Sequence, residues 1–218
     1  NTVRKQVLAE IETEYGKATL NVANILTKLL RLQQITSGFT RDDASDTVVE
    51  LKYQPKMEAV LDEVSSIIDA EEAVVVWCRF LKTIDMVATR LDKVGIPYIT
   101  MCGKDSPSEK GKKWKEYQKS KKVNVFVGQV ESGGIGIELF KLDSDPFKSQ
   151  YMIYVENTFS MDTRIQSQGR IDRIGQRSLC VYKDLVVDGT VDEKILSILQ
   201  ENKRVADLIL QRKVGDVI

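Results

Sequence analysis

Histidine is absent from the 218 residues, which excludes histidine-based acid–base catalysis and the common zinc sites. Cysteine is scarce: Cys78, Cys102 and Cys180 are odd in number, lack CxxC spacing and lie in apolar runs. They are typical of reduced core residues of an intracellular protein, in the cytoplasm or with the DNA of a nucleoid or nucleus. No apolar run is long enough to span a bilayer and no signal-peptide pattern is found, so we expect no membrane partner.

An excess of either charge is also lacking. Lysine plus arginine number 32 and aspartate plus glutamate number 32, so the formal net charge is zero. Nucleic-acid binders are usually basic, so any such binding must use a local patch or a shared surface. The length suits one large domain, or one domain with an appendage. Because the chain starts at Asn1 and not at Met, we expect a fragment of something longer.

Hydrophobic periodicity changes along the chain. Residues 1–37 have helical spacing, closed by Gly38, and a polar connector follows to residue 54. From Pro55 onward, apolar strand-like runs alternate with amphipathic helical runs; the predicted strands are 73–78, 96–103, 123–129, 151–157 and 179–187. This alternation predicts βαβ units in a three-layer α/β domain with a mainly parallel sheet, residues 55–189. Residues 190–218 are predicted to form a long C-terminal bracing helix.

Local signals mark several helix ends. Ser106 with Glu109, and Thr190 with Glu193, have capping-box spacing, and Gly95 is expected to end a helix. In the lysine-rich run 104–122, Trp114 and Tyr117 are interleaved with the basic residues. That run favours a solvated helix whose two aromatic side chains pack on the sheet, with phosphate contact as the less favoured alternative.

Ligand sites of open α/β sheets lie beyond the carboxyl ends of the strands. This rule indicates residues 78–80, 102–104, 128–136 and 156–159. Arg79 and Phe80 follow the first strand, either as ligand contacts or as a simple strand end. Glycines 133, 134 and 136 follow the third strand, where they allow either close approach of a phosphate or a tight turn. This is not a Walker A loop, since no GK[ST] follows.

Two arginines stand three apart in QSQGRIDRIGQ, residues 166–176. Residues at i and i+3 share a helix face, so the forks of Arg170 and Arg173 could reach one phosphate-bearing target, with Gly175 ending the turn. The alternative is a solvated face with an ion pair to Asp172 and Gly175 as an ordinary C-cap. The motif alone leaves both open.

The order of these segments resembles the second RecA-like domain of superfamily-two helicases, and most of all the SWI/SNF-type DNA translocases. In that family a GGLGINL-type segment precedes a QAxxRxxRxGQ segment; the matching residues here are Gly133, Gly134, Gly136 and Leu139, then Gln166, Gln168, Arg170, Arg173, Gly175 and Gln176. LLRLQQITSGF, residues 29–39, resembles the family's LLRLRQIC stretch. VYKDLVVDGTVDEKIL, residues 181–196, resembles VYRLVTKGTIEEKIL, so the resemblance covers nearly the whole chain.

The resemblance implies that Arg170 and Arg173 act as catalytic arginine fingers on ATP held by a first RecA-like lobe. It implies ATP contacts at Gly134, Gly136, Glu138, Gln166 and Gln176. It implies contacts to the backbone of DNA, expected to be duplex, at Arg79, Phe80, Gln129, Ser132, Gly133 and Phe159. The chain has no Walker A lysine and no metal-binding carboxylate pair, so ATP and Mg²⁺ are expected mainly on that other lobe, preceding Asn1. The fragment alone is then inactive and holds no metal itself.

The chain departs from the family pattern at several positions. The usual Ser-Thr-Arg before the glycines is Gln129, Val130 and Glu131, which puts a phosphate-contacting hydroxyl there in question. The usual tryptophan is Phe159 and the usual histidine between the arginines is Asp172, while a few extra residues lie around 141–148. These changes indicate a divergent member, viral or bacterial.

Two other functions are weighed against this one. A Rossmann-type nucleotide-binding enzyme predicts GxGxxG after the first strand, and VVVWCRFLKT has none. A non-catalytic nucleic-acid or protein interaction module that keeps the fold would more readily have lost one of the two arginines, and both are present.

Overall fold

Parallel strands alternate with amphipathic helices in this computed structural model of the protein. The structure describes residues 22–42, 47–133, 137–141, 149–172 and 179–200. Its internal contacts divide the chain into two compact units, one of Met57–Leu185 and the other of Asn1–Lys56 with Val186–Ile218. Each unit is described by itself.

The larger unit is built on a five-stranded sheet with the order β4-β5-β3-β6-β7. Every neighbouring pair in it is parallel. The strands are β3 (Ala73–Cys78), β4 (Tyr98–Met101), β5 (Val125–Gln129), β6 (Ser149–Tyr154) and β7 (Leu179–Asp184). The prediction of a parallel α/β sheet is therefore confirmed; β3 has its predicted bounds, and the other four strands are shorter than their apolar runs.

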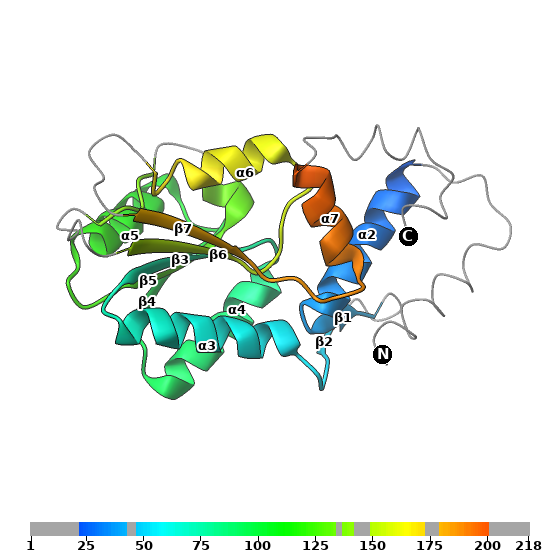
Figure 1. Cartoon of the computed structure of the whole chain (residues 1–218), viewed down its shortest axis with the longest axis horizontal. Helices are drawn as coiled ribbons and strands as arrows, with labels where there is room; N and C mark the ends of the chain where they lie inside the picture. Colours follow the sequence, from blue (N-terminus) through cyan, green and yellow to red (C-terminus); the bar gives the residue numbers. More distant parts are fainter. Residues whose placement is uncertain (1–21, 43–46, 134–136, 142–148, 173–178, 201–218) are drawn as a thin grey trace, which may run out of the picture. The chain divides into compact units, whose positions relative to one another are not determined.

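Helices cover both faces of this sheet. They are α3 (Pro55–Asp69), α4 (Leu81–Val94), α5 (Pro107–Lys119) and α6 (Met161–Gln168). In Figure 1, α3 and α4 lie on one face and α5 and α6 on the other, as right-handed crossovers require. Because both faces are covered, all six residues of β3 are buried, which explains why its sequence is continuously apolar.

Aromatic side chains fill the core between the sheet and α5. Trp77 and Phe126 meet edge to face with ring centroids 6.3 Å apart, and Tyr117 lies 5.3 Å from Phe126. Gly128 is required beside them, since a Cβ there would come within 2.7 Å of the Trp77 ring. Tyr117 is buried and Trp114 packs against the same cluster, so the favoured interpretation of the lysine-rich helix is confirmed.

The expected caps of α4 and α5 are present. Ser106 and Glu109 form a reciprocal capping box, and Gly95 ends α4 in the left-handed region at φ 73°. The carboxyl end of α5 has a cap that the sequence did not indicate: the Lys141 ammonium donates hydrogen bonds to the carbonyl oxygens of Tyr117, Ser120 and Val123. Burial lowers the pKa of Lys141 to about 8.

The three cysteines are free thiols. Cys78 is buried as predicted, and burial first, then the Glu156 carboxylate, raises its pKa well above the ordinary value. A thiol with a raised pKa is a poor nucleophile, so Cys78 is a core residue. Cys102 and Cys180 are only half-buried, so their predicted place in the core was wrong.

The smaller unit contains α2 (Val22–Thr36), β1 (Phe39–Arg41), β2 (Val48–Glu50) and α7 (Val191–Gln200). β1 and β2 pair antiparallel, so the predicted connector was wrong where it contains this hairpin. Three-residue strands are too short for an alternation signal, and all of β2 is exposed. In α7 the apolar residues Ile195, Ile198 and Leu199 are buried. Residues 201–218 of the predicted C-terminal helix lie outside the described residues.

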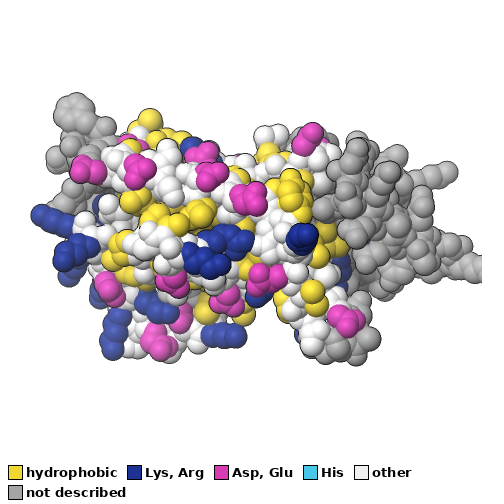
Figure 2. Space-filling model, turned by 90° about the horizontal axis from the view of Figure 1, so that it is seen from below, with side chains coloured by type: hydrophobic (Ala, Val, Ile, Leu, Met, Phe, Trp, Pro, Cys, Tyr) yellow, Lys and Arg dark blue, Asp and Glu magenta, His cyan; other side chains and the backbone are white. Residues whose placement is uncertain are grey.

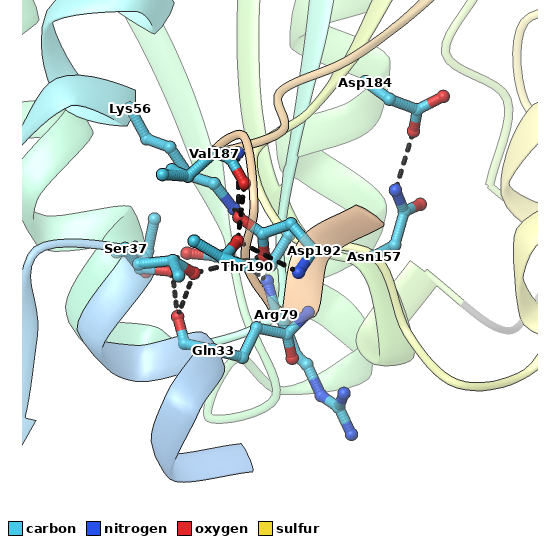
Figure 3. A network of polar contacts seen from close by, with 12 residues as sticks. Gln33, Ser37, Lys56, Arg79, Asn157, Asp184, Val187, Thr190 and Asp192 are labelled. Carbon is cyan, nitrogen blue, oxygen red and sulfur yellow. Dashed lines mark hydrogen bonds and ion pairs between the residues drawn. The ribbon is translucent and has the colours of Figure 1, made fainter. Parts of the chain in front are cut away.

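A buried ion pair organises the polar interior of this unit. The Asp192 carboxylate lies 2.8 Å from the Lys56 Nζ, and both side chains are almost fully buried, at 4% and 3% exposed. The same carboxylate accepts hydrogen bonds from the Thr36 hydroxyl at 3.1 Å and from the Val187 N–H at 3.1 Å (Figure 3). Asp192 therefore joins the end of α2, the start of α3 and the loop before α7.

We expect Asp192→Asn to lower the free energy of unfolding by about 3–5 kcal/mol, because the Lys56 charge is left buried without its counter-charge. Equilibrium denaturation measures this. The matched control is Asp188→Asn, since Asp188 is exposed in the same loop. Equal stability of the two variants would contradict the importance of the pair.

Candidate functional site

The topology of the larger unit creates one switch point. From β3 the chain moves to one side for β4 and β5, and to the other side for β6 and β7. In sheets of this kind the crevice for a ligand opens beyond the carboxyl ends of the strands at such a point. The segments after β3, β5 and β6 are therefore the place to search for a site.

Arg79 lies at that edge and contacts two aromatic side chains. Its guanidinium carbon lies 4.2 Å from the centroid of the Phe159 ring, and 6.0 Å from that of Phe80. The side-chain amide of Gln129 donates to the Arg79 carbonyl at 3.3 Å and accepts from the Gly103 N–H at 3.1 Å. Four residues proposed from the sequence, on three different strand ends, are thus brought together: Arg79, Phe80, Gln129 and Phe159.

Glu156 holds this edge of the sheet in place through its hydrogen bonds, and the sequence analysis did not propose it as a site residue. It is 1% exposed and lies two residues after the end of β6. Its carboxylate accepts from the Arg79 N–H at 2.9 Å and from the Thr83 hydroxyl at 2.7 Å. The negative charge lies at the positive end of α4, whose N-cap Phe80 offers no capping side chain. The only sequence signal was its position at a strand end.

Glu131 is the second carboxylate at this edge. Its Oε1 lies 3.8 Å from the Arg79 Nε. Burial lowers the pKa of Arg79, while Glu131 and Glu156 act to raise it. Burial also raises the pKa of Glu131, an effect larger than the opposing pull of Arg79. The edge therefore contains one guanidinium and two carboxylates.

The loop after β5 is described only in part. The segment Val130–Gly133 forms the 3₁₀ helix η1, which contains the backbone of Ser132 and Gly133. The other proposed residues of the glycine and arginine segments, Gly134, Gly136, Arg173 and Gln176, lie outside the described residues.

Arg170 lies in a tight turn and not on a helix. The helix α6 ends at Gln168 with Gly169 as its C-cap, and the Arg170 N–H bonds back to the Ser167 carbonyl at 3.1 Å. The expected helical position of Arg170 was therefore wrong, because glycine at 169 is a poor helix former and the chain tightens there. Gln166 is exposed on the last turn of α6.

The arginine turn is hydrogen-bonded directly to the glycine segment. The Leu139 N–H donates to the Arg170 carbonyl at 2.7 Å, and the Arg170 guanidinium donates to the Ile137 carbonyl at 3.3 Å. Glu138 lies between these two contacts and is half-buried. Two segments about thirty residues apart in the sequence thus share one backbone frame.

A buried arginine that the sequence did not single out holds α6 in place. Arg164 is 8% exposed, and its two terminal nitrogens contact the two carboxylate oxygens of Asp184, at 2.5 and 3.1 Å. It also donates to the Asn157 side chain at 2.5 Å, and Asn157 in turn donates to Asp184 at 2.7 Å (Figure 3). The guanidinium carbon lies 3.4 Å from the Tyr154 ring centroid.

This network ties α6 to the carboxyl ends of β6 and β7. Tyr154 ends β6, Asp184 ends β7, and the Tyr154 hydroxyl also meets the Ser167 hydroxyl at 2.6 Å. Because α6 leads directly into the arginine turn, the packing of α6 fixes the position of Arg170. An arginine on a mainly polar helix has no sequence signal that separates a buried clamp from a solvated side chain.

In the described ranges, no group of three or more Cys, Asp or Glu side chains is placed to hold a metal ion. Nor does any helix in them have the length and apolar character needed to cross a bilayer. Charged side chains of both signs are interspersed over the face shown in Figure 2.

Two curated relatives share this sequence at low identity. A Mycoplasma pneumoniae protein named "Uncharacterized ATP-dependent helicase" is 22% identical over 214 residues, covering 98% of this chain and 19% of that protein. The Xenopus tropicalis SWI/SNF-related matrix-associated actin-dependent regulator of chromatin subfamily A-like protein 1 is 25% identical over 153 residues, covering 70% of this chain and 16% of that protein. No family model matches the chain.

Solved structures share the fold. The Sulfolobus solfataricus SWI2/SNF2 ATPase C-terminal domain superposes with a TM-score of 0.68 at 17% identity, covering 99% of this chain and 91% of that chain. The core of that ATPase in complex with dsDNA gives a TM-score of 0.68 at 19% identity, covering 99% of this chain and 45% of that chain. The chain has the RecA-like fold of these SWI2/SNF2 ATPase domains, and its sequence is similar to those of the two curated relatives. It spans less than a fifth of the length of the two curated relatives.

We expect Arg164→Met to lower the free energy of unfolding by about 3 kcal/mol, near the lower limit for a broken buried pair. The value is at that limit because the Asp184 side chain keeps 20% exposure and so part of its hydration. Arg164→Lys should recover only part of the loss, because an ammonium cannot copy the planar fork over Tyr154. Chemical denaturation measures both.

The control for this series is Asp162→Asn, an exposed carboxylate on the same helix. If Arg164→Met is no less stable than this control, α6 is not held by the clamp.

Proposed function

We propose that this chain is the second RecA-like lobe of an ATP-dependent DNA translocase or helicase. In this function Arg170 and Arg173 reach ATP bound on a first lobe, and the carboxyl edge of the sheet contacts the DNA backbone. The observation that carries the proposal is the hydrogen bond from the Leu139 N–H to the Arg170 carbonyl. This hydrogen bond joins the glycine segment to the arginine turn, and the family resemblance assigns both segments to nucleotide contact.

The ATP side of the lobe consists of few groups. The guanidinium of Arg170 donates to the Ile137 main-chain carbonyl, which holds in place a planar fork of the kind that suits phosphoryl oxygens. Such a fork stabilises the charge that develops on a transferring γ-phosphoryl group. Gly134, Gly136, Glu138, Gln166 and Gln176 are proposed as the surrounding ATP contacts.

ATP and Mg²⁺ themselves are proposed to bind mainly to a first lobe that precedes this one in the same polypeptide. The chain has no GK[ST] loop to cradle the phosphates. When bound, the Mg²⁺-nucleotide supplies the phosphoryl group and its charge neutralisation, and this lobe contributes the arginines.

The DNA side is proposed at Arg79, Phe80, Gln129, Ser132, Gly133 and Phe159. A guanidinium beside aromatic rings can meet a phosphate while the rings exclude water from the contact. Because the net charge is zero, this contact has to be local and not a broad basic surface. A related ATPase core was solved in complex with dsDNA, which supports duplex DNA as the partner and a place inside the cell with that DNA.

The isolated chain is expected to show no DNA-stimulated ATP hydrolysis, because the groups that hold triphosphate and magnesium are proposed to be elsewhere. It should bind duplex DNA weakly, with an affinity that falls steeply as salt rises. A coupled ATPase assay and a fluorescence-anisotropy titration at several salt concentrations measure the two properties. DNA-dependent turnover by the purified chain would overturn the two-lobe proposal.

In the protein that contains both lobes, Arg170→Ala should lower kcat by about a thousandfold, the effect of removing an arginine finger. ATP and DNA affinity should change much less, since the finger acts on charge that develops in the transition state. Arg170→Lys should recover little activity, because an ammonium lacks the planar fork.

The matched control is Arg41→Ala, an exposed arginine on β1. Steady-state ATPase and thermal unfolding are measured on the same samples. Normal turnover by a folded Arg170→Ala protein would remove Arg170 from the proposed mechanism.

A further inference from the structure

The cation proposed to meet DNA already faces two carboxylates. The Glu131 Oε1 lies 3.8 Å from the Arg79 Nε, and the Glu156 carboxylate accepts from the Arg79 backbone N–H at 2.9 Å. Among the described residues, the charges that act on the Arg79 guanidinium are those of Glu131 and Glu156. These three groups sum to a negative charge at the place where a phosphate is proposed to bind. The arrangement therefore opposes phosphate binding unless one carboxylate moves or is neutralised.

The two carboxylates differ in how firmly they are held. Glu156 is 1% exposed and is bound by the Thr83 hydroxyl and the Arg79 N–H, so it forms part of the fold. The Glu131 side chain is 43% exposed, whereas that of Arg79 is 15% exposed and lies against the Phe159 ring. Glu131 is therefore the group that can exchange, while Arg79 stays in place.

The contact between Glu131 and Arg79 is loose. A charge-assisted hydrogen bond between nitrogen and oxygen has a length of about 2.7–2.9 Å. At 3.8 Å the pair has Coulomb attraction without that bond. A carboxylate and a phosphate occupy the same donor fork of an arginine, so either can take the place of the other.

Two further charged residues lie on the loop after β4. The loop after β4, which reaches Gln129 through the Gly103 N–H, carries Asp105, paired with Lys113 at 2.7 Å. It also carries Lys104, which is exposed. β5 itself has no charged residue.

The helix α6 also packs against η1 and carries two charged residues. Arg164 is paired with Asp184, and Asp162 is exposed. The charges that act on the Glu131 carboxyl are those of Arg79 and Glu156.

We propose that Glu131 is a specificity-determining residue that competes with the DNA phosphate for Arg79. This inference rests on the proposed DNA contact at the carboxyl edge of the sheet. A phosphate binds only by displacing Glu131, which then remains close to it as a like charge. The competitor keeps the grip of this lobe on the backbone weak, so that the contact is released as readily as it forms.

The competition depends on pH with a defined sign. Burial raises the pKa of Glu131, so this carboxyl takes up a proton at a higher pH than ordinary glutamates. The protonated side chain neither pairs with Arg79 nor repels phosphate, so DNA affinity rises as pH falls through that pKa. The chain has no histidine to produce a similar change near neutral pH.

The test is a fluorescence-anisotropy titration of the purified chain with a duplex oligonucleotide at low salt. Glu131→Gln should bind about fivefold tighter than wild type at neutral pH, the effect of removing one like charge beside a phosphate. Its affinity should change less than that of wild type between about pH 5 and about pH 8, a range above the ordinary glutamate pKa. Glu131→Asp, which keeps the charge, should stay within twofold of wild type, roughly the scatter of a neutral change.

Two controls separate the competitor from a general charge effect. Glu58→Gln makes the same charge change at an exposed site on α3, and should not reproduce the gain. In an Arg79→Gln background most of the gain from Glu131→Gln should disappear, because there is no longer a shared guanidinium.

Failure of the inference and failure of the proposed function give different results. If wild type binds duplex DNA and Glu131→Gln binds no tighter than Glu58→Gln, the competition is overturned while the DNA contact stands. If neither wild type nor Glu131→Gln binds duplex DNA at any pH, the proposed DNA surface is wrong and the competition with it.

Discussion

Strand β3 is hydrogen-bonded on both edges and covered on both faces, and the larger unit is arranged around it. It pairs with β5 on one side and β6 on the other, in parallel register. A strand in that position has no access to water, so its end has to be closed by groups that satisfy the backbone internally. Glu156 performs that closure at the Arg79 N–H, and the same contact makes the strand end a charged site.

Two buried ion pairs organise the polar interior of the described residues. Asp192 with Lys56, and Asp184 with Arg164, are pairs in which each charge neutralises a partner that burial would otherwise penalise. Each also collects hydrogen bonds from loops, at Thr36 and Val187 in one unit and at Asn157 in the other. Such pairs add specificity of arrangement more than net stability, since both partners lose their hydration.

The two proposed contact surfaces are positioned by different parts of the larger unit. The Arg79 edge depends on strand ends, whereas Arg170 depends on a turn whose backbone is bonded to the Ile137–Leu139 segment. The Arg164 clamp lies close to both, because it fixes Asn157 after β6 and the helix that precedes Arg170. The Arg164 clamp thus supports both of the proposed contact surfaces.

The sequence by itself determined the periodic and local features. The alternation of apolar strand-like and helical runs determined the parallel α/β sheet. The Ser106 capping box and Gly95 determined helix ends. The glycine and arginine motifs carried the family resemblance. It did not determine the β1–β2 hairpin, whose three-residue strands carry no period, nor the turn at Arg170, where Gly169 ends the helix early. Only the tertiary structure decided which charges meet. Thr36 and Asp192 are 156 positions apart, and Thr83 and Glu156 are 73 apart. Whether a carboxylate or guanidinium is solvated or buried depends on what the fold places beside it, and no local spacing encodes that.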